Sequence, residues 1–216
     1  MMDRLDPGKL PRHIAVIMDG NGRWARQKLL NRIKGHRKGI DVARDTVTAC
    51  RELGVEYLTL YTFSRENWAR PAYEVATLMR LLEVHLKGEK KSLVENNIRF
   101  AAIGAVFELP ASVRAVIEDI KEATAGNTGM VLQLALSYSG REEIARAARE
   151  AARRVAEGTL RPDDITEEVL AGFMYTAGAP DPDLLIRTSG ESRISNFLLW
   201  QLAYTEIHII DVLWPD

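Results

Sequence analysis

Six short apolar runs alternate along this chain with segments of helical periodicity, and this alternation constrains the fold more than any other feature. The runs are His13–Met18, Tyr57–Phe63, Ile98–Gly104, Met130–Tyr138, Leu184–Thr188 and Ile207–Leu213. Most are apolar on both faces, as expected for strands of a sheet that is covered on both sides. Strands that alternate with helices favour parallel βαβ units. We therefore expect a single α/β domain with a mostly parallel six-stranded sheet and helices on both of its faces.

The segments between these runs show helical stripes. Ile40, Ala43, Val47 and Cys50 form one stripe, and Ile144, Ala148, Ala152 and Val155 form another. Gly54 and Gly158 follow them as helix stop signals. A further apolar segment, Phe197–Ala203, predicts a helix, whereas Tyr73–Leu86 is apolar on more than one face. Such a helix is usually buried in a core, although a long apolar cavity would need the same composition.

Composition narrows the class of protein. The chain has 216 residues, of which 46% are hydrophobic, and a formal net charge of −1. This length suits one domain with a sizeable core, and the small net charge argues against a general nucleic-acid binder. The single Cys50 excludes an intrachain disulfide and a cysteine-based zinc cluster.

We expect residues 1–12 to form an N-terminal extension and residues 13–216 to form the domain. Residues 1–9 contain no apolar core of a signal peptide, and no run of about 18 apolar residues occurs anywhere. A cytoplasmic protein is therefore expected. A weak peripheral contact with a membrane surface stays open.

One isolated acid, Asp19, ends the first apolar run and precedes a glycine turn made by Gly20 and Gly22. From Gly20 to Ile40 there is no other Asp or Glu, and the same stretch is rich in basic residues, namely Arg23, Arg26, Lys28, Arg32, Lys34, His36, Arg37 and Lys38. An acid beside a glycine turn and a basic segment suggests a phosphate site bridged by a metal ion. The alternative is a simple tight hairpin, but no alternating strand follows the turn. Neither a Walker loop nor a full dinucleotide fingerprint is present.

Two other polar patches follow apolar runs. The first, Phe63–Pro71, mixes a hydroxyl, a carboxylate, an amide and two guanidinium groups with an indole; it would serve either as a ligand-contacting loop or as a capped loop before a helix. The second, Arg187–Asn196, offers two arginines around a Ser/Gly turn to a second anion. Alternatively, Ser195 only caps a helix and Arg187 pairs with a nearby aspartate, Asp181 or Asp183.

Because ligands of parallel sheets bind at the carboxyl ends of strands, Asp19, Ser64 and Arg187 are expected at one site. Glu206 precedes an otherwise apolar run; an isolated exposed glutamate is the usual explanation, and a metal ligand would need to lie near Asp19. Together the patches give two anion sites, one magnesium carboxylate and abundant aliphatic lining. Substrates with diphosphate heads and apolar tails fit these features better than a nucleotide does, because no base-stacking or ribose-reading motif is present.

These residues also carry a specific likeness. The segments concerned are His13–Ala25, Gly35–His36, Thr62–Pro71, Thr124–Gly129, Leu185–Glu191, Arg193–Gln201 and Asp211–Asp216. They resemble the cis-prenyltransferases, and within that family the bacterial undecaprenyl diphosphate synthases (isoprenyl transferases). The likeness runs in one register from about His13 to Asp216.

The resemblance implies a homodimer with a hydrophobic tunnel. It also implies Mg²⁺-dependent, repeated condensation of isopentenyl diphosphate onto an allylic starter such as farnesyl diphosphate, forming cis double bonds. The product expected is undecaprenyl diphosphate for the lipid carrier of cell-wall synthesis, with a peripheral membrane contact for its release. No nucleic-acid partner is implied.

The resemblance also implies roles for particular residues. Asp19 matches the essential acid that handles the magnesium diphosphate, Asn67 matches a residue proposed to help remove the proton, and Glu206 matches a second magnesium ligand. Positions that hold the allylic diphosphate are matched by Gly20, Asn21, Gly22, Arg23, Arg32 and His36. Aromatic positions beside the substrates are matched by Trp24 and Trp68, and the adjoining substrate loop by Ser64, Arg65, Glu66 and Arg70. The isopentenyl diphosphate site is matched by Arg187, Arg193, Ile194 and Ser195.

The chain departs from the family pattern at several positions. Ser192 stands where some members have a metal-proximal His, Leu29 where Gly is common, and Ala105 where Asp is usual. Ser137-Tyr-Ser-Gly-Arg141 replaces a commoner Asn-Tyr-Gly-Gly-Arg. Relatives usually continue beyond the position of Asp216 through a basic C-terminal tail; either that tail is not included in this sequence or the site lacks a contribution from it.

Three alternative functions remain. Thr62 is bulkier than the Ala that some relatives place near the tunnel, which favours a shorter product. A non-catalytic partner subunit of a heteromeric synthase would lack the catalytic Asp motif, which this chain retains. A polyanion-binding module that uses the basic segment would bind in a salt-sensitive manner without turnover.

Overall fold

The computed structural model of the protein describes residues 6–216, apart from the side chain of Pro7. Residues 1–5 of the predicted N-terminal extension lie outside the described residues. Between Asp6 and the first strand, the short 3₁₀ helix η2 (Pro7–Lys9) is capped by the Asp6 side chain, which accepts a hydrogen bond from the Gly8 N–H at 3.0 Å.

Six strands form one sheet in the described part of the chain. They are β1 (His13–Ile17), β2 (Tyr57–Ser64), β3 (Arg99–Ile103), β4 (Val131–Tyr138), β5 (Leu184–Arg187) and β6 (Glu206–Ile209). Their order is β3-β4-β2-β1-β5-β6, and every neighbouring pair is parallel. The prediction of a six-stranded parallel sheet is therefore confirmed.

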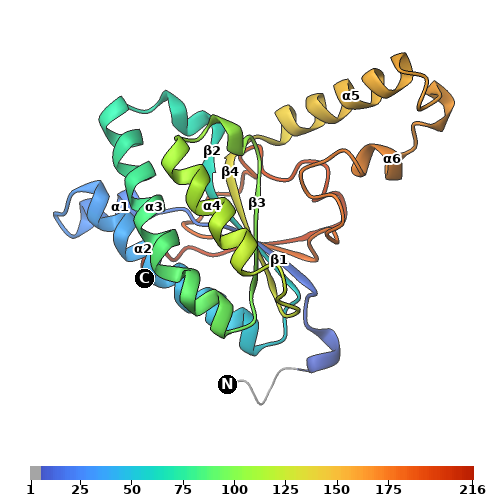
Figure 1. The fold of residues 1–216 in the computed structure, drawn as a ribbon. Helices are drawn as coiled ribbons and strands as arrows, with labels where there is room; N and C mark the ends of the chain where they lie inside the picture. Colours follow the sequence, from blue (N-terminus) through green and yellow to red (C-terminus); the bar gives the residue numbers. More distant parts are fainter. Residues whose placement is uncertain (1–5) are drawn as a thin grey trace.

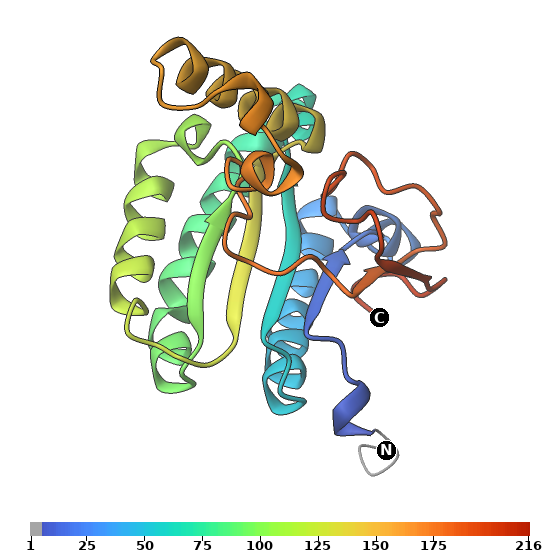
Figure 2. The ribbon, with the colours of Figure 1, turned by 90° about the vertical axis from the view of Figure 1, so that its right-hand side faces the viewer.

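The α-helices are α1 (Asn21–Gln27), α2 (Arg32–Glu52), α3 (Ala72–Glu95), α4 (Ala111–Ala123), α5 (Gly140–Ala156) and α6 (Glu167–Ala171). Short 3₁₀ helices lie at η3 (Arg65–Ala69), η4 (Val106–Glu108) and η5 (Pro162–Asp164). Helices α2, α3 and α4 cover one face of the sheet, whereas α5 runs outward from the end of β4 (Figures 1 and 2). Within residues 6–216, no helix has both the length and the apolar character needed to cross a membrane.

The two faces of the sheet contribute to two separate apolar clusters. On β1, Ile14 and Val16 pack into the larger cluster with residues of α3 and α4, while Ala15 and Ile17 belong to the other cluster. This alternation follows from the pleat of a strand. Because both sets are apolar, the strand is buried on both sides, as its sequence predicts.

The helix predicted at Phe197–Ala203 is wrong: this segment forms turns. Leu198 has a φ of 44°, in the left-handed region, as do Ser195 and Asn196 just before the segment with 50° and 60°, and such residues interrupt a right-handed helix. Phe197 and Leu198 are both completely buried in the cluster on the second face of the sheet. A turn can bury two consecutive side chains in this way, and this packing replaces the expected helix.

The backbone at Leu29 explains why the family pattern commonly has Gly at this position. Leu29 follows α1 with φ of 56° and a side chain that is 95% exposed. A left-handed residue at the end of a helix favours glycine, which explains why glycine is expected here.

Candidate active site

The carboxyl ends of β1, β2 and β5 meet around one polar cavity, at the edge of the sheet where parallel folds bind ligands. The cavity is lined by Ile17, Met18, Asp19, Tyr61, Ser64, Glu66, Asn67, Arg70, Arg187, Arg193, Ser195 and Asn196. Three arginines and two carboxylates therefore face one space. Asp19, Ser64 and Arg187, which are far apart in the sequence, come together here.

Asp19 is held by its backbone as well as by its carboxylate. Its N–H donates to the Thr188 hydroxyl at 2.9 Å, and its carbonyl oxygen accepts from the same hydroxyl at 2.6 Å. Its Oδ1 accepts from the Gly20 N–H at 2.7 Å, and its Oδ2 accepts from Arg187 at 2.8 Å, with Arg23 at 3.7 Å. The side chain is 32% exposed. Asp19 is thus an ordered carboxylate that lies between two guanidinium groups. Solvent or a ligand can still reach this carboxylate.

The turn after Asp19 requires glycine and leads directly into α1. Gly20 has φ of 112°, and a Cβ at this position would lie 3.0 Å from the Cα of Leu213. No side chain caps the first turn of α1. In that turn Arg23 donates to the Ser189 carbonyl at 3.2 Å and to the Ser189 hydroxyl, so α1 is tied to the loop after β5.

Arg187 is the central cation of the site. Its side chain is 4% exposed; it donates to Asp19, to the Ser195 hydroxyl at 2.7 Å and to the Arg193 carbonyl. Its Nε is buried and has no partner among the described residues. An unpaired buried donor costs about 1–3 kcal/mol. Arg187 therefore does not form the alternative pair with Asp181 or Asp183.

The segment from Ser64 to Arg70 forms η3 with a reciprocal cap. The Ser64 side chain accepts from the backbone of Asn67, while the Asn67 carbonyl oxygen accepts from the Ser64 N–H at 3.2 Å. Because this bond occupies the carbonyl side of the Asn67 amide, its NH₂ group is the part left for a ligand. Asn67 is therefore a hydrogen-bond donor in this geometry.

Glu66 and Asn196 join η3 to the loop after β5. The Asn196 amide donates to Glu66 at 2.8 Å and to the Ser139 hydroxyl at 2.8 Å. Burial raises the pKa of Glu66, but the hydrogen bonds, first that from Asn196, outweigh burial and leave the pKa below its ordinary value. Glu66 is consequently ionised at neutral pH and fixes Asn196 across the cavity.

A cluster of alternating charge lies at the start of α2 and α3. Arg70 donates to Glu74 at 2.8 Å, and Arg32 lies 3.9 Å from the same carboxylate. Burial, followed by the charge of Arg70, lowers the pKa of His36 below 6.5, while Glu74 opposes the shift and Arg32 adds to it. His36 is thus neutral at pH 7 in the unliganded protein.

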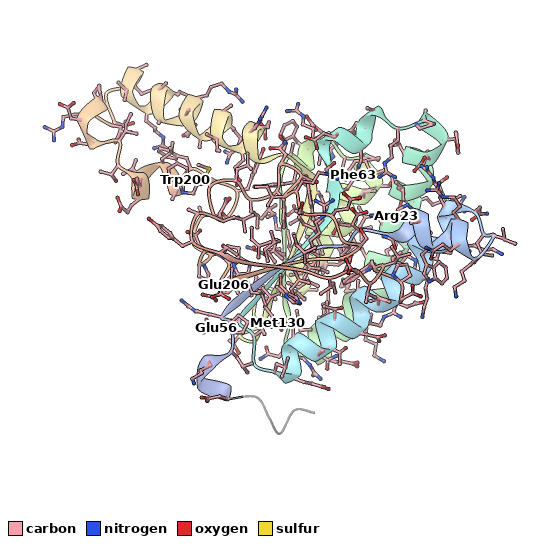
Figure 3. All side chains as sticks on the ribbon, turned by 180° about the vertical axis from the view of Figure 1, so that it is seen from behind. Arg23, Glu56, Phe63, Met130, Trp200 and Glu206 are labelled. Carbon is pink, nitrogen blue, oxygen red and sulfur yellow. The ribbon has the colours of Figure 1, made fainter. Side chains whose placement is uncertain are left out.

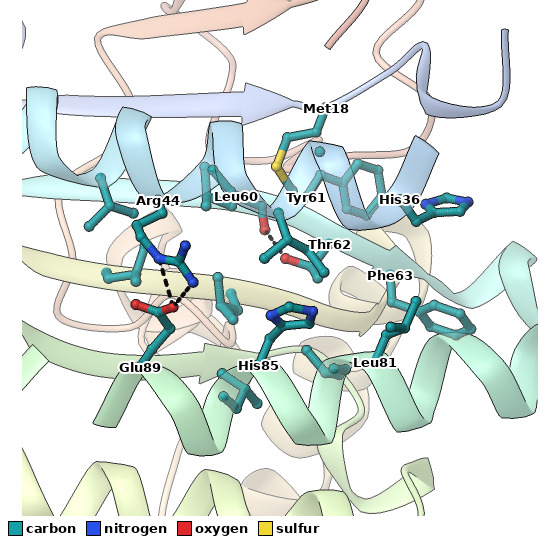
Figure 4. A pocket seen from close by; sticks show the side chains of 18 of the residues that line it. Met18, His36, Arg44, Leu60, Tyr61, Thr62, Phe63, Leu81, His85 and Glu89 are labelled. Atoms are coloured by element: carbon teal, nitrogen blue, oxygen red, sulfur yellow. Dashed lines mark hydrogen bonds and ion pairs between the residues drawn. The ribbon is translucent and has the colours of Figure 1, made fainter. Parts of the chain in front are cut away.

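An apolar groove of about 310 Å³ extends from the polar cavity between α2, α3 and the sheet (Figure 4). Its apolar lining includes Ile40, Ala43, Val47, Leu60, Phe63, Leu78, Met79, Leu82, Leu86 and Leu134. Met18, Tyr61, Asn67 and Arg70 line both spaces, so the polar cavity and the groove are contiguous. One molecule with an anionic head and an apolar tail can occupy both.

The remaining predicted residues lie around these two spaces. His36 lines the groove, Arg32 lies 3.9 Å from Glu74, and the position of a Gly22 Cβ is 3.9 Å from Arg32. Asn21 lines the groove. The Trp24 indole donates to Asp216 at 2.7 Å, and Arg193 is a 65% exposed cation that pairs with Glu191.

Three predicted residues support the wall of the site. Trp68 packs against Phe63 with ring centroids 5.1 Å apart, Arg65 pairs with Glu108, and Ile194 packs on the second apolar cluster.

Glu206 is not brought to Asp19 within one chain. It begins β6 in register with Leu184, which in turn is in register with Ile14, five residues before Asp19. At 3.3 Å per residue, Asp19 lies about 16 Å farther along the strand direction. Figure 3 shows Glu206 beside Glu56 and Met130, which precede β2 and β4, and away from Arg23. Glu206 thus lies near the amino ends of the strands, opposite the carboxyl ends that surround the polar cavity.

The residues present fit a magnesium ion that is shared with a ligand. Mg²⁺ typically takes one or two carboxylates and completes its shell with phosphate oxygens and water. Asp19 supplies one partly exposed carboxylate at the cavity, and no group of three His, Cys, Asp or Glu that could hold a metal occurs within the described residues. The protein would therefore hold the ion through Asp19 and a diphosphate.

Several residues at the site were not singled out from the sequence as site residues. Tyr61 lines both spaces and stacks on Phe197 at 4.3 Å, Thr188 fixes the backbone of Asp19, and Glu74 joins Arg32 to Arg70. Thr188 directly follows Arg187, so its place in that patch was a usable signal. Tyr61 lies inside an apolar run and gave no such signal.

Comparison with known proteins gives a consistent picture. Residues 17–216 match the sequence model of a prenyltransferase family described as "Putative undecaprenyl diphosphate synthase". An isoprenyl transferase of Geobacter sulfurreducens is 53% identical over 215 residues, which is 100% of this chain and 87% of that protein. One of Heliobacterium mobile is 49% identical, covering 100% of this chain and 83% of that protein.

Two solved structures share the fold. Lavandulyl diphosphate synthase from Lavandula x intermedia, in complex with dimethylallyl diphosphate, has a TM-score of 0.93 and 39% identity, covering 95% of this chain and 89% of that one. A probable undecaprenyl diphosphate synthase from Campylobacter jejuni has a TM-score of 0.78 and 32% identity, covering 96% and 89%.

Proposed function

This chain belongs to the undecaprenyl diphosphate synthase family of prenyltransferases, and from that premise we propose that it condenses isopentenyl diphosphate repeatedly onto an allylic diphosphate such as farnesyl diphosphate. The proposed product is a cis-polyprenyl diphosphate of undecaprenyl length, the lipid carrier of cell-wall synthesis. The proposed cofactor is Mg²⁺.

One observation carries this proposal: a polar cavity rich in arginine opens into an apolar groove through four shared residues. A diphosphate with a prenyl tail has the same division into an anionic head and an apolar chain. Arg70, Arg187 and Arg193 line the cavity, and Arg23 lies 3.7 Å from Asp19 and pairs with Glu191, as Arg193 does. This gathering of cations supports the binding of more than one diphosphate group.

The charges in the cavity suit ionisation of an allylic diphosphate. Negative charge develops on the leaving group as its C–O bond breaks, and fixed donors stabilise that charge where it appears. Arg187 is already oriented for this purpose by Asp19 and Ser195. The apolar groove keeps water away from the allylic cation. When bound, Mg²⁺ would add Lewis-acid stabilisation of the same phosphate oxygens.

Asn67 has a narrower proposed role than that of a base. An amide is a poor proton acceptor, and its carbonyl oxygen is engaged by the Ser64 N–H. We assign its NH₂ group to orienting the isopentenyl diphosphate or a water molecule in a relay that removes the proton after condensation.

A shorter product is the second candidate. The guanidinium of Arg44 on α2 reaches across the groove to Glu89 on α3, with Nε 2.9 Å from Oε1 (Figure 4). Arg44 is eight residues after His36, or about 12 Å along the helix. The side chain of Thr62 also lines the groove. The Arg44–Glu89 pair and Thr62 narrow the path of a long prenyl tail and favour a shorter product. A non-catalytic subunit is disfavoured on a different ground, because Asp19 and Asn67 both line the cavity.

The decisive experiment incubates the purified protein with farnesyl diphosphate and labelled isopentenyl diphosphate, with Mg²⁺ or with EDTA, and sizes the products. A ladder that requires Mg²⁺ and ends at undecaprenyl length is expected. A ladder that stops earlier would support the second candidate. If the folded protein incorporates no label, the proposed function is wrong.

We also propose a homodimer. Tyr204, Ile207 and Val212, which flank or belong to the edge strand β6, expose large apolar side chains. Covering them with a second copy would remove apolar surface from water. As a magnesium ligand, Glu206 would have to reach the site of such a second copy.

A further inference from the structure

The junction between β4 and α5 contains a serine that contacts the candidate substrate loop. Ser137 is completely buried and has φ of 46°, and it stands where the cis-prenyltransferase pattern commonly has Asn. Its hydroxyl accepts from the Trp68 indole N–H at 2.8 Å and donates to Glu108 at 2.5 Å. One buried hydroxyl thus connects η3 with η4.

Glu108 completes a closed path back to η3. Its second oxygen accepts from the Arg65 guanidinium at 2.9 Å. The path Trp68–Ser137–Glu108–Arg65 therefore begins and ends within one five-residue segment, Arg65–Ala69. Asn67 lies between the two anchored residues, with its own carbonyl group engaged by Ser64.

The donors and acceptors along this path are consistent. An indole N–H can only donate, a hydroxyl can accept and donate at once, and an ionised carboxylate can only accept. The hydrogen bonds along the path therefore all run toward the Glu108 carboxylate. Hydrogen bonds to a charged group are stronger than those between neutral groups. Without the Ser137 hydroxyl, the indole N–H and one carboxylate oxygen would lose their partners together.

We propose that Ser137 and Glu108 are positioning residues that hold η3 in its active geometry and thereby orient Asn67 toward the substrates. This inference rests on the proposed function for its kinetic consequence. Trp68 acts in the same frame: it packs on Phe63 and bonds Ser137, so it transmits the position of the β4 end to the loop.

The first test is Ser137→Ala, with Ser137→Asn as the conservative rescue, because Asn tolerates a left-handed backbone and can both accept and donate. In the prenyl-transfer assay, Ser137→Ala should lower kcat about tenfold with KM for both diphosphates changed less than twofold, the effect of losing one hydrogen bond. Ser137→Asn should restore most of kcat. Ser112→Ala is the matched control, because Ser112 also donates to a glutamate, Glu83, at 2.8 Å, but on the exposed surface.

A second measurement needs no turnover. The fluorescence of Trp68 is obtained by subtracting the spectrum of the Trp68→Phe variant from that of the protein that retains Trp68. The efficiency with which acrylamide quenches this fluorescence should rise at least twofold in Ser137→Ala. Glu108→Gln, which keeps the shape but removes the charge opposite Arg65, should give the same change to a smaller extent. If Ser137→Ala does not fold, Glu108→Gln carries both measurements.

The outcomes separate this inference from the proposed function. Wild-type kcat and unchanged Trp68 quenching in a folded variant would overturn the positioning role. If the wild-type protein shows no prenyl transfer, the proposed function fails, and the Trp68 quenching alone decides whether Ser137 and Glu108 hold the loop.

Discussion

At the scale of single residues, Asp19 has the most interactions at the site. It accepts from Gly20 and Arg187 and lies near Arg23, yet a third of its side chain is exposed. Its charge therefore compensates a nearly buried arginine while it stays within reach of a ligand. One carboxylate serves both to order the cavity and to hold the proposed magnesium diphosphate.

Asp19→Asn should reduce kcat by about 10²–10³, because the amide keeps the shape but loses the charge that stabilises Arg187 and that would hold the proposed metal ion. Steady-state turnover at saturating Mg²⁺, with the melting temperature measured in parallel, checks this. Asp45→Asn, on the exposed side of α2, is the control. Near-normal turnover in Asp19→Asn would remove Asp19 from the proposed metal site.

His36 should make stability depend on pH. Its pKa in the folded protein is below 6.5, so as the pH falls through about 6.5 the unfolded chain takes up a proton before the folded protein does. The free energy of unfolding should therefore fall as the pH is lowered, by about 1.4 kcal/mol for each pKa unit between the two states. Urea unfolding at pH 7.5 and 5.5 should show a smaller loss in His36→Gln than in the wild type; an equal loss would contradict the assignment.

Sequence reasoning at this scale succeeded where a residue ends a strand and failed where its partner is distant. Arg187 ends β5 and Asp19 lies two residues after the end of β1, so their meeting could be predicted. The engagement of Asn67 by Ser64 is local, yet it needed the observed 3₁₀ turn. The bond from Trp68 to Ser137 joins positions 69 residues apart and left no pattern.

At the scale of elements, two glycines set the position of α1 on α2. A Cβ at Gly35 would lie 2.1 Å from the Asn21 carbonyl oxygen, and one at Gly39 would lie 2.2 Å from the Asn21 side-chain oxygen. The two helices can therefore approach only where α2 lacks side chains. Because α1 carries Arg23, this contact also sets the distance between Arg23 and Asp19.

Gly35→Ala should destabilise the protein by about 1–3 kcal/mol, since the new methyl group collides with backbone. Gly88→Ala is the matched control: Gly88 also lies inside a helix, α3, but a Cβ there meets nothing within 4 Å. That change should stabilise by about 0.5–1 kcal/mol. Denaturant titration of both variants checks the pair, and equal effects would show that the close approach is not the cause.

Helices and strands with a regular pattern of apolar residues could be predicted from the sequence. The amphipathic stripes of α2 and α5 and the apolar runs of all six strands correspond to real elements. The predicted helix at Phe197–Ala203 failed because apolar character alone does not distinguish a helix from a buried turn. Leu198, the left-handed residue inside this segment, is an ordinary apolar residue and gives no warning.

At the scale of the whole molecule, the proposed function depends on the polar cavity being contiguous with the apolar groove. The polar cavity draws on β1, β2 and β5, and the groove on α2, α3 and the sheet. The parallel sheet was predictable from the alternating pattern, but the strand order was not. That order brings Arg187 beside Asp19, whereas Glu206, as the first residue of β6, lies near the amino ends of the strands.

If Glu206 acts across a homodimer, mixing Asp19→Ala with Glu206→Gln should restore activity at limiting Mg²⁺. Each mixed dimer would contain one site with both carboxylates intact, so random exchange should give about a quarter of the wild-type rate, as expected for a symmetric pair. The rate of the mixture is compared with the sum of the separate rates. A rate equal to that sum would leave Glu206 without a role at the site.

The central position of β1 also bears on how the protein is made. Its two neighbours are β2, about 40 residues onward, and β5, about 170 residues onward. During synthesis, one edge of β1 therefore waits unpaired until almost the whole chain has left the ribosome, and distant pairings of this kind form slowly. Until then Asp19 has no Arg187, so the nascent chain cannot capture its substrates. Competence to bind would come only with the last strands, and a prematurely terminated chain would leave an open strand edge.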